Sequence, residues 1–224
     1  MTMELRVNEI FETIQGEATY TGTPSIFVRL QGCPVGCPWC DTKHTWESAP
    51  LDEIDPEQML RKVNDAPTWA KITDRALTDY IGQLKSRHVV ITGGEPCIYD
   101  LTGITEKLIM EARRSVQIET SGTHEIRCHP KSWVTVSPKV GMPGGFTVRK
   151  DALLRANEIK MPIGKPDDIE TLQIVLGEMP DRLPPPVWLQ PLSKSIKATD
   201  LCYEAAREHG WQVSIQAHKF IGYR

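Results

Sequence analysis

The chain has 224 residues, of which 40% are hydrophobic and 25% charged, and its formal net charge at pH 7 is -3. This length and composition predict one soluble globular domain over residues 1–224 and argue against disordered, collagen-like and membrane classes, since no apolar run approaches the roughly 18 residues of a membrane span. Charges of both signs are scattered along the chain, so direct binding of nucleic acid is not expected, and the lack of a readable secretory signal predicts a cytoplasmic protein.

The first predicted strand covers residues 25–30, which are apolar, rich in strand formers and preceded by a turn at residues 21–24. Three cysteines follow directly, so a metal site there would lie beyond the carboxyl end of this strand, where α/β sheets and barrels bind ligands. Apolar residues at helical spacing over 77–84 predict a helix. Residues 88–92 then predict a buried strand that ends in a Gly-Gly-Glu-Pro loop at residues 93–96.

The same alternation of helices and strands continues to the end of the chain. We expect helices over residues 101–112, 152–156, 169–176 and 199–209, the last ended by Gly210, and strands over 116–119, 133–136, 187–190 and 211–216. The prolines within residues 179–186 predict a surface connection. Strands separated by helices of roughly ten residues predict crossover connections and a mostly parallel sheet, open or curved into a partial barrel, so the fold class is α/β.

Cys33, Cys37 and Cys40 lie in one short loop, in which Gly36 lets the backbone wrap closely around a ligand. A structural zinc site takes four protein ligands, whereas three thiolates on a 4Fe-4S cluster leave one iron open to another ligand. The alternatives are a zinc knuckle with a remote fourth ligand such as Cys97 or Cys128, or incidental clustering.

The spacing of these cysteines, with Trp39 before the last, closely resembles the cluster motif of the radical S-adenosylmethionine (SAM) superfamily. The segment Thr92-Gly-Gly-Glu-Pro96 looks like the Gly-Gly-Glu-Pro element of the same superfamily. The resemblance implies an abbreviated radical SAM partial barrel of mostly parallel strands with outer helices. It also implies that SAM chelates the open iron, whose cluster donates the electron that generates a 5′-deoxyadenosyl radical.

Five further segments look like the 7-carboxy-7-deazaguanine synthase family: residues 13–17, 29–33, 40–46, 119–123 and 137–139. The resemblance extends from Glu9 to His218. It implies ring contraction of 6-carboxy-5,6,7,8-tetrahydropterin to 7-carboxy-7-deazaguanine and ammonia, a step towards queuosine, a tRNA modification. In this family the radical takes a hydrogen from C6 of the pterin, and SAM can be regenerated.

Site residues follow from the same resemblance, position by position. The residues implied to bind the pterin are Ile14, Gln15 and Gly16 through their backbone, Arg29 through the substrate carboxylate, and Thr92. Those implied to bind SAM are Gly94, Glu119, Ser121, Ser137, Pro138, Lys139 and Gln190. Thr42 matches the position that gives Mg2+ an oxygen ligand, and Asp41 either steadies a metal-bound water or faces solvent.

The resemblance also implies a homodimer and a separate reducing electron-donor protein. No role is assigned to His218, and the C-terminal residues 222–224 show no motif that carries over from the family. Two other functions remain open from the sequence. The first is another small radical SAM enzyme, such as a glycyl-radical-enzyme activase, and the second is a non-enzymatic binding module stabilised by zinc.

Overall fold

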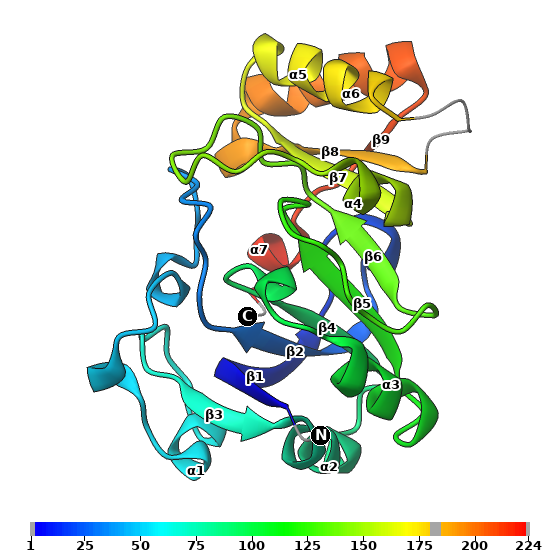
Figure 1. Ribbon diagram of the computed structural model, residues 1–224. Coiled ribbons are helices and arrows are strands. Elements are labelled where there is room, and N and C mark those ends of the chain that lie inside the picture. The colour runs from blue at the N-terminus through cyan, green and yellow to red at the C-terminus, as the bar shows by residue number, and fades with distance from the viewer. Residues whose placement is uncertain (1–2, 180–184, 223–224) are drawn as a thin grey trace.

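The computed structural model of the chain describes residues 3–179 and 185–222, which form a curved sheet with helices packed on it (Figure 1). The strands are β1 (Glu4–Ile14), β2 (Pro24–Leu30), β3 (Ala70–Thr73), β4 (His88–Gly93), β5 (Ser115–Thr120), β6 (Trp133–Val136), β7 (Glu158–Ile163), β8 (Val187–Pro191) and β9 (Gln212–Val213). The helices are α1 (Pro56–Leu60), α2 (Asp74–Gln83), α3 (Thr102–Met110), α4 (Lys150–Arg155), α5 (Pro166–Gly177), α6 (Ile196–His209) and α7 (His218–Ile221).

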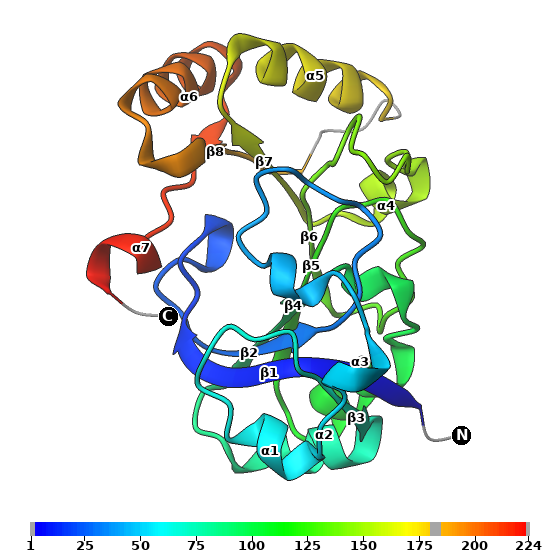
Figure 2. The same cartoon turned by 90° about the vertical axis from the view of Figure 1, so that its left-hand side faces the viewer.

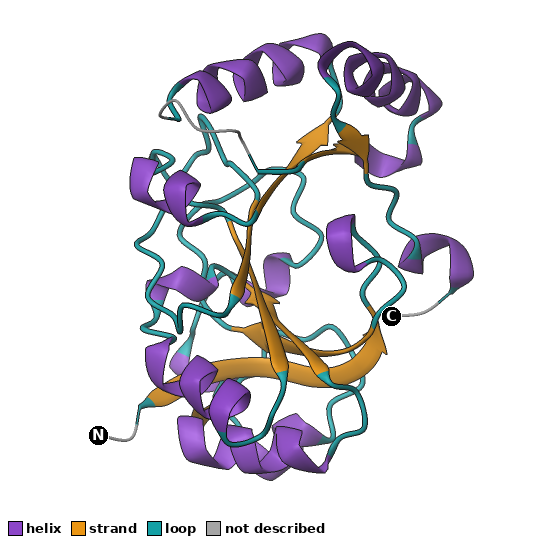
Figure 3. Cartoon of the chain, turned by 90° about the vertical axis from the view of Figure 1, so that its right-hand side faces the viewer, coloured by secondary structure: helices purple, strands orange, loops and turns teal. Residues whose placement is uncertain are grey.

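The sheet has the strand order β3-β1-β2-β4-β5-β6-β7-β8-β9. All neighbours from β2 to β9 pair in parallel, whereas β1 is antiparallel to both β2 and β3. Figure 3 shows the strands curving into a partial barrel, with α7 on its open side. The predicted α/β partial barrel of mostly parallel strands is therefore confirmed.

The apolar core forms two clusters along this sheet. One packs β1, β2, β4 and β5 against helices α2 and α3, and includes Ile26, Ile91 and Leu108. The other packs β6, β7 and β8 against α4, α5 and α6. Because each helix buries one apolar face on the outside of the sheet, the inner face of the barrel is left for polar groups.

Most predicted elements are confirmed within a few residues. Thr73 caps the N-terminus of α2, where its hydroxyl accepts a hydrogen bond from the Ala76 N–H at 3.2 Å. Gly210 ends α6 with a φ of 69°, as the sequence predicts. The predicted surface connection at residues 179–186 lies mainly outside the described residues. No helix in the described part of the chain is long and apolar enough to cross a membrane.

Parts of the sheet differ from the prediction, which expects no strand at β1 or at β3 (Ala70–Thr73) and a longer last strand. The sequence does not predict β1, because Asn8 and Glu9 interrupt its apolar pattern, yet both side chains are fully buried. Asn8 donates to Gln31 Oε1 at 2.7 Å, and Glu9 accepts from Arg29 Nε at 2.6 Å. The last strand is shorter than residues 211–216, because the chain leaves the sheet after Val213 and the Ser214 hydroxyl binds the Ala18 N–H.

Candidate active site

A cavity of about 430 Å³ opens at the carboxyl ends of the parallel strands, on the inner face of the partial barrel. This is the edge at which α/β barrels bind their ligands. Most of the residues singled out from the sequence line it: Ile14, Gln15, Arg29, Cys33, Cys37, Cys40, Thr42, Thr92, Gly94, Glu119, Ser121, Ser137, Lys139 and Gln190. Gly16 and Pro138 do not line this cavity, although Pro138 lines a neighbouring pocket that shares Trp39 with it.

The loop that carries the three cysteines leaves β2 and is held by backbone hydrogen bonds to the segment that follows it. Gly32 N–H donates to Thr45 O at 2.7 Å, and Cys33 N–H donates to Trp46 O at 2.9 Å. Cys40 N–H donates back to Cys37 O at 3.0 Å, which closes the loop on itself. The fold therefore directs all three thiols into one cavity.

The thiols fit an iron-sulfur cluster better than a zinc ion. Three thiols line this cavity, which suits a 4Fe-4S cluster with one iron left open, whereas a structural zinc site takes four protein ligands. The remote cysteines do not supply a fourth ligand, because Cys97 and Cys128 pack in or against the apolar core and neither lines the cavity. Burial raises the pKa of Cys33 to about 11, so iron binding would have to displace a proton there.

The Gly-Gly-Glu-Pro loop after β4 packs directly on the cysteine loop. Gly94 N–H donates to Leu30 O at 2.9 Å, and Glu95 N–H donates to Gly32 O at 2.8 Å. The buried Glu95 carboxylate accepts hydrogen bonds from Thr120 Oγ1 at 2.6 Å and from both the N–H and the hydroxyl of Ser121. Glu95 therefore connects the loop after β4 to the end of β5. It also accepts the hydrogen bond of the Ser121 hydroxyl, the group that the resemblance implies to bind SAM.

Gly94 has no room for a side chain, because a Cβ there would lie 2.1 Å from the carbonyl oxygen of Gly32. Gly94→Ala is expected to push the two loops apart, lowering the free energy of unfolding by about 1 to 3 kcal/mol and reducing iron uptake. Urea unfolding and iron analysis after anaerobic reconstitution measure both effects. The control is Gly82→Ala on α2, which meets nothing within 4 Å and should be neutral or stabilising. Equal iron content in Gly94→Ala and the wild type would contradict the prediction.

Arg29 lies on β2 next to Thr92 on β4, its partner in the parallel register. Its Nε donates to the buried Glu9 carboxylate, and its guanidinium carbon lies 5.8 Å from the centre of the Phe11 ring. The side chain is 17% exposed and lines the cavity. Glu9 thus orients the guanidinium, which lines the cavity and has the geometry to pair with a carboxylate.

The residues implied for SAM occupy several strand ends. Lys139, after β6, donates to Ser137 Oγ at 2.5 Å and to Ser137 O at 3.0 Å, and burial lowers its pKa. Gln190 is buried, and its Oε1 has no hydrogen-bond partner among the described residues. A buried acceptor left without a donor is what a nucleoside hydroxyl or amino group would satisfy. Glu119 lies at the other side of the cavity, beside Thr92 and Gln15.

The residues considered for Mg2+ follow the last cysteine. Thr42 Oγ1 lies 3.5 Å from Cys40 Sγ, at the wall of the cavity. The Asp41 carboxylate is largely exposed and lies 3.6 Å from Lys219 Nζ in α7. The Thr42 hydroxyl would be a single protein ligand. This is sufficient for Mg2+, which commonly completes its octahedral coordination with substrate oxygens and waters.

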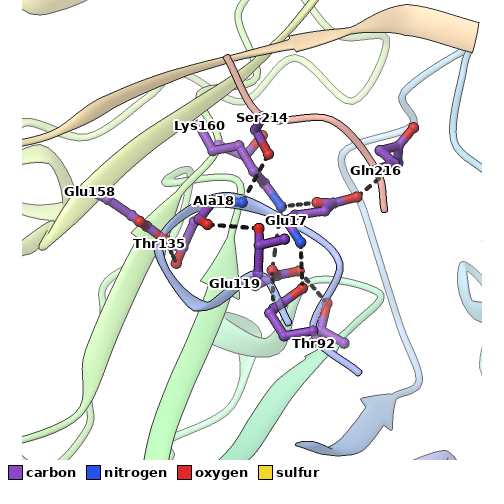
Figure 4. Close-up of polar contacts among 12 residues, drawn as sticks. Glu17, Ala18, Thr92, Glu119, Thr135, Glu158, Lys160, Ser214 and Gln216 are labelled. Carbon is purple, nitrogen blue, oxygen red and sulfur yellow. Dashed lines mark hydrogen bonds and ion pairs between the residues drawn. The ribbon is translucent and has the colours of Figure 1, made fainter. Parts of the chain in front are cut away.

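The cavity also contains polar side chains to which the sequence assigns no role, among them Glu17, Lys160, Gln216 and His218. Figure 4 shows Glu17, Lys160 and Glu119 pointing toward one another, with Gln216 on the far side of Glu17. A signal for Lys160 is present in the sequence, because Glu158 and Lys160 alternate with apolar residues in β7 and so share its inner face. No comparable signal marks Gln216.

The C-terminal segment lies against the loop after β1, as Figure 2 shows for α7. Ala217 N–H donates to Gly16 O at 2.9 Å, and a Cβ on Gly16 would lie 2.1 Å from His218 Nδ1. Gly16 is therefore adjacent to the cavity through His218. Burial lowers the pKa of His218, so its imidazole is mainly neutral at pH 7.

Comparison with known proteins gives matches over nearly the whole chain. The model of the radical SAM superfamily matches residues 27–130. The chain is 49% identical over 221 residues to the 7-carboxy-7-deazaguanine synthase of Escherichia coli strain K12, which covers 98% of this chain and 99% of that protein. It is 42% identical over 220 residues to the enzyme of that name from Buchnera aphidicola, with 97% and 98% coverage. The crystal structure of QueE from Escherichia coli matches with a TM-score of 0.93 and 50% identity, over 96% of this chain and 95% of that one.

Proposed function

This chain belongs to the 7-carboxy-7-deazaguanine synthase family of radical SAM enzymes, and on that premise we propose how its cavity contracts the ring of 6-carboxy-5,6,7,8-tetrahydropterin. The products are 7-carboxy-7-deazaguanine and ammonia, which places the chain in queuosine and deazapurine biosynthesis. Neither the glycyl-radical-enzyme activase nor the zinc-stabilised module is favoured, because the relatives named above match over at least 97% of this chain.

One observation carries the proposal: the cluster thiols and a cation suited to a carboxylate line the same cavity. Cys33, Cys37 and Cys40 form one wall, and Arg29, two strand positions before the loop, belongs to another. A 4Fe-4S cluster bound by these thiols would supply the electron that cleaves SAM, and so the radical that removes hydrogen from the pterin. Arg29 would then fix the substrate carboxylate, and with it the neighbouring C6.

The remaining residues would bind and enclose the two ligands. Gly94 lets the backbone approach the methionine end of SAM, and Lys139 supplies a buried amino group near Cys37. Ser137, Pro138, Ser121 and Gln190 complete the SAM side, while Ile14, Gln15, Gly16 and Thr92 face the pterin. Glu119 is better placed for the pterin than for SAM, because it accepts hydrogen bonds from Gln15 and Thr92.

We assign Mg2+ to Thr42, with substrate oxygens and waters as its other ligands. The ion would orient the pterin. A pterin-binding measurement in the presence and absence of Mg2+ tests this assignment, and equal affinities would contradict it.

We also propose that residues 1–224 work as one domain, that two copies form a homodimer, and that a separate cytoplasmic electron-donor protein reduces the cluster. The support is the single continuous sheet and the family to which the chain belongs. Sedimentation velocity of the reconstituted protein tests the dimer. A monomer at micromolar concentration would contradict it.

The reaction itself is tested by incubating anaerobically reconstituted protein with reductant, SAM, Mg2+ and 6-carboxytetrahydropterin, and following the pterin by mass spectrometry. The expected product is the deazaguanine acid, formed with loss of ammonia. Formation of deoxyadenosine without this product would support the radical SAM chemistry but contradict the assignment of the pterin as substrate. Hydrogen abstraction from a partner protein's glycine would instead support the activase.

A further inference from the structure

A buried lysine joins two glutamates in the floor of the cavity. Lys160 Nζ, on β7, contacts the Glu17 carboxylate in the loop after β1 and lies 3.3 Å from Glu119 Oε1 on β5. The three side chains are 7%, 13% and 18% exposed, and all three line the cavity. The triad of Glu17, Lys160 and Glu119 therefore brings together residues up to 143 positions apart in the sequence.

Removing these charges from water is costly, so each must be compensated. Burial favours a neutral Glu17, but the Lys160 ammonium outweighs this effect and lowers the pKa of Glu17 to about 2. Burial likewise favours a neutral Lys160, but Glu119 and Glu17 together raise its pKa. Glu17 and Lys160 therefore form an ion pair at neutral pH, and the ammonium of Lys160 also contacts Glu119.

Other groups hold the triad in place. Glu17 accepts a hydrogen bond from Gln216 Nε2 at 2.7 Å, and Glu119 accepts from Gln15 Nε2 at 3.2 Å and from Thr92 Oγ1 at 3.4 Å. Figure 4 shows Gln216 and Thr92 on opposite sides of the triad. The other charged or titratable groups that act on it are Lys139 after β6, His218 in α7 and His88 on β4.

The triad lies across the cavity from Arg29. Arg29 pairs with Thr92 in the register of β2 and β4, and the Thr92 hydroxyl contacts Glu119 on β5. Arg29 and Glu119 are therefore two strands apart, about 10 Å between their backbones. Along the cavity wall, the charge therefore changes from the guanidinium of Arg29 on β2 to the two glutamates of the triad, two strands away. This polarity matches a ring system with a carboxylate at one end and amino and N–H donors at the other.

We propose that Lys160 is a positioning residue that keeps Glu17 and Glu119 both charged and aligned, so that the two carboxylates accept hydrogen bonds from the aminopyrimidine half of the pterin. This inference rests on the proposed function, because the pterin is the ligand that it names. Lys160 acts on the substrate through the glutamates, since its ammonium group is directed at their oxygens.

Removal of the ammonium has a pH signature. In Lys160→Met the two carboxylates face each other without a cation, so they are expected to share a proton, and a protonated carboxyl is a poorer acceptor. Near pH 6.5, the Kd of Lys160→Met for 6-carboxytetrahydropterin should be about tenfold or more above that of the wild type. This ratio of the two Kd values should shrink as the pH is raised to about 9, because both carboxylates then lose their protons. Lys160→Arg keeps the charge and should restore a ratio that does not depend on pH.

The experiment uses cluster-loaded protein with SAM, and titrates the pterin by anaerobic calorimetry across this pH range. Lys197→Met, at an exposed site on α6, is the matched control and should bind as the wild type does. If Lys160→Met does not fold, the double variant Lys160→Met/Glu17→Gln removes the repulsion between the two carboxylates. Its affinity for the pterin should be lower than that of the wild type by the same factor at every pH. A Kd for Lys160→Met within twofold of wild type at all pH values would overturn the proposal.

A second measurement needs no substrate. Infrared difference spectra should show a protonated carboxyl band near neutral pH in Lys160→Met, and no such band in wild type or Lys160→Arg. Identical spectra in all three would overturn the role of Lys160. If the band appears as expected but wild-type protein neither binds nor converts the pterin, the proposed function fails and the effect of Lys160 on the two glutamates stands.

Discussion

Cys37→Ala is expected to lose the iron-sulfur cluster and SAM cleavage together. Cys37 is the middle one of the three proposed ligands, the residue is only 9% exposed, and it lines the cavity. Two thiolates cannot hold a cube that already has one iron without a protein ligand. Iron and sulfide analysis after anaerobic reconstitution, and deoxyadenosine formation with reductant and SAM, should both fall to background.

The control for this variant is Cys202→Ala. Cys202 is a fully buried thiol in the second apolar cluster and does not line the cavity. This change should keep the iron content and lower the free energy of unfolding by only about 1 kcal/mol, as expected for deleting one small buried group. Retention of SAM cleavage by Cys37→Ala would show that the ligand assignment is wrong.

Arg29→Ala is expected to keep the cluster but weaken binding of 6-carboxytetrahydropterin by about 2 to 5 kcal/mol, the cost of truncating one partner of a buried charge pair. The change also leaves the buried Glu9 carboxylate without its cation, which lowers the stability of the folded chain. Arg29→Ala/Glu9→Gln removes that second effect and should retain the loss of affinity. Anaerobic calorimetry with the pterin measures the binding.

Two comparisons separate recognition of the carboxylate from general damage. A tetrahydropterin without the 6-carboxylate should bind wild type and the double variant with the same affinity, since it lacks the group that Arg29 is proposed to hold. Arg61→Ala, whose side chain is 83% exposed just after α1, should leave binding of the carboxylated substrate unchanged. Undiminished affinity of the double variant for 6-carboxytetrahydropterin would refute the role of Arg29.

Local patterns were sufficient for much of the fold. The strand at residues 25–30 and the strand at residues 88–92 are confirmed as β2 and β4, because each is rich in strand-forming apolar residues, of which Ile26, Val28, Leu30 and residues 89–91 are buried in the sheet. β1 could not be found in this way. Its buried side chains Asn8 and Glu9 form hydrogen bonds with Gln31 and Arg29, which are more than 19 positions away in the sequence. The burial of these polar groups is therefore explained only once the strands are paired.

The same difference applies to the site. The cysteine spacing and the Gly-Gly-Glu-Pro loop are contiguous in sequence, so a single chain shows them, and Gly94 fits because its loop packs on Gly32. The sequence also presents Glu17 within a segment typical of the family. It gives no indication that Glu17 meets a lysine on β7 or that Gln216 returns to bind it.

By itself, then, the sequence determined the class of fold and the family, and it predicted the cluster ligands, because these depend on the order and spacing of residues close together in the chain. The tertiary structure alone decided the charges along the cavity wall, with Arg29 held by Glu9 and Lys160 held between two glutamates. The physical reason is that a buried charge is stable only beside a partner, and in this fold the partners arrive from different strands.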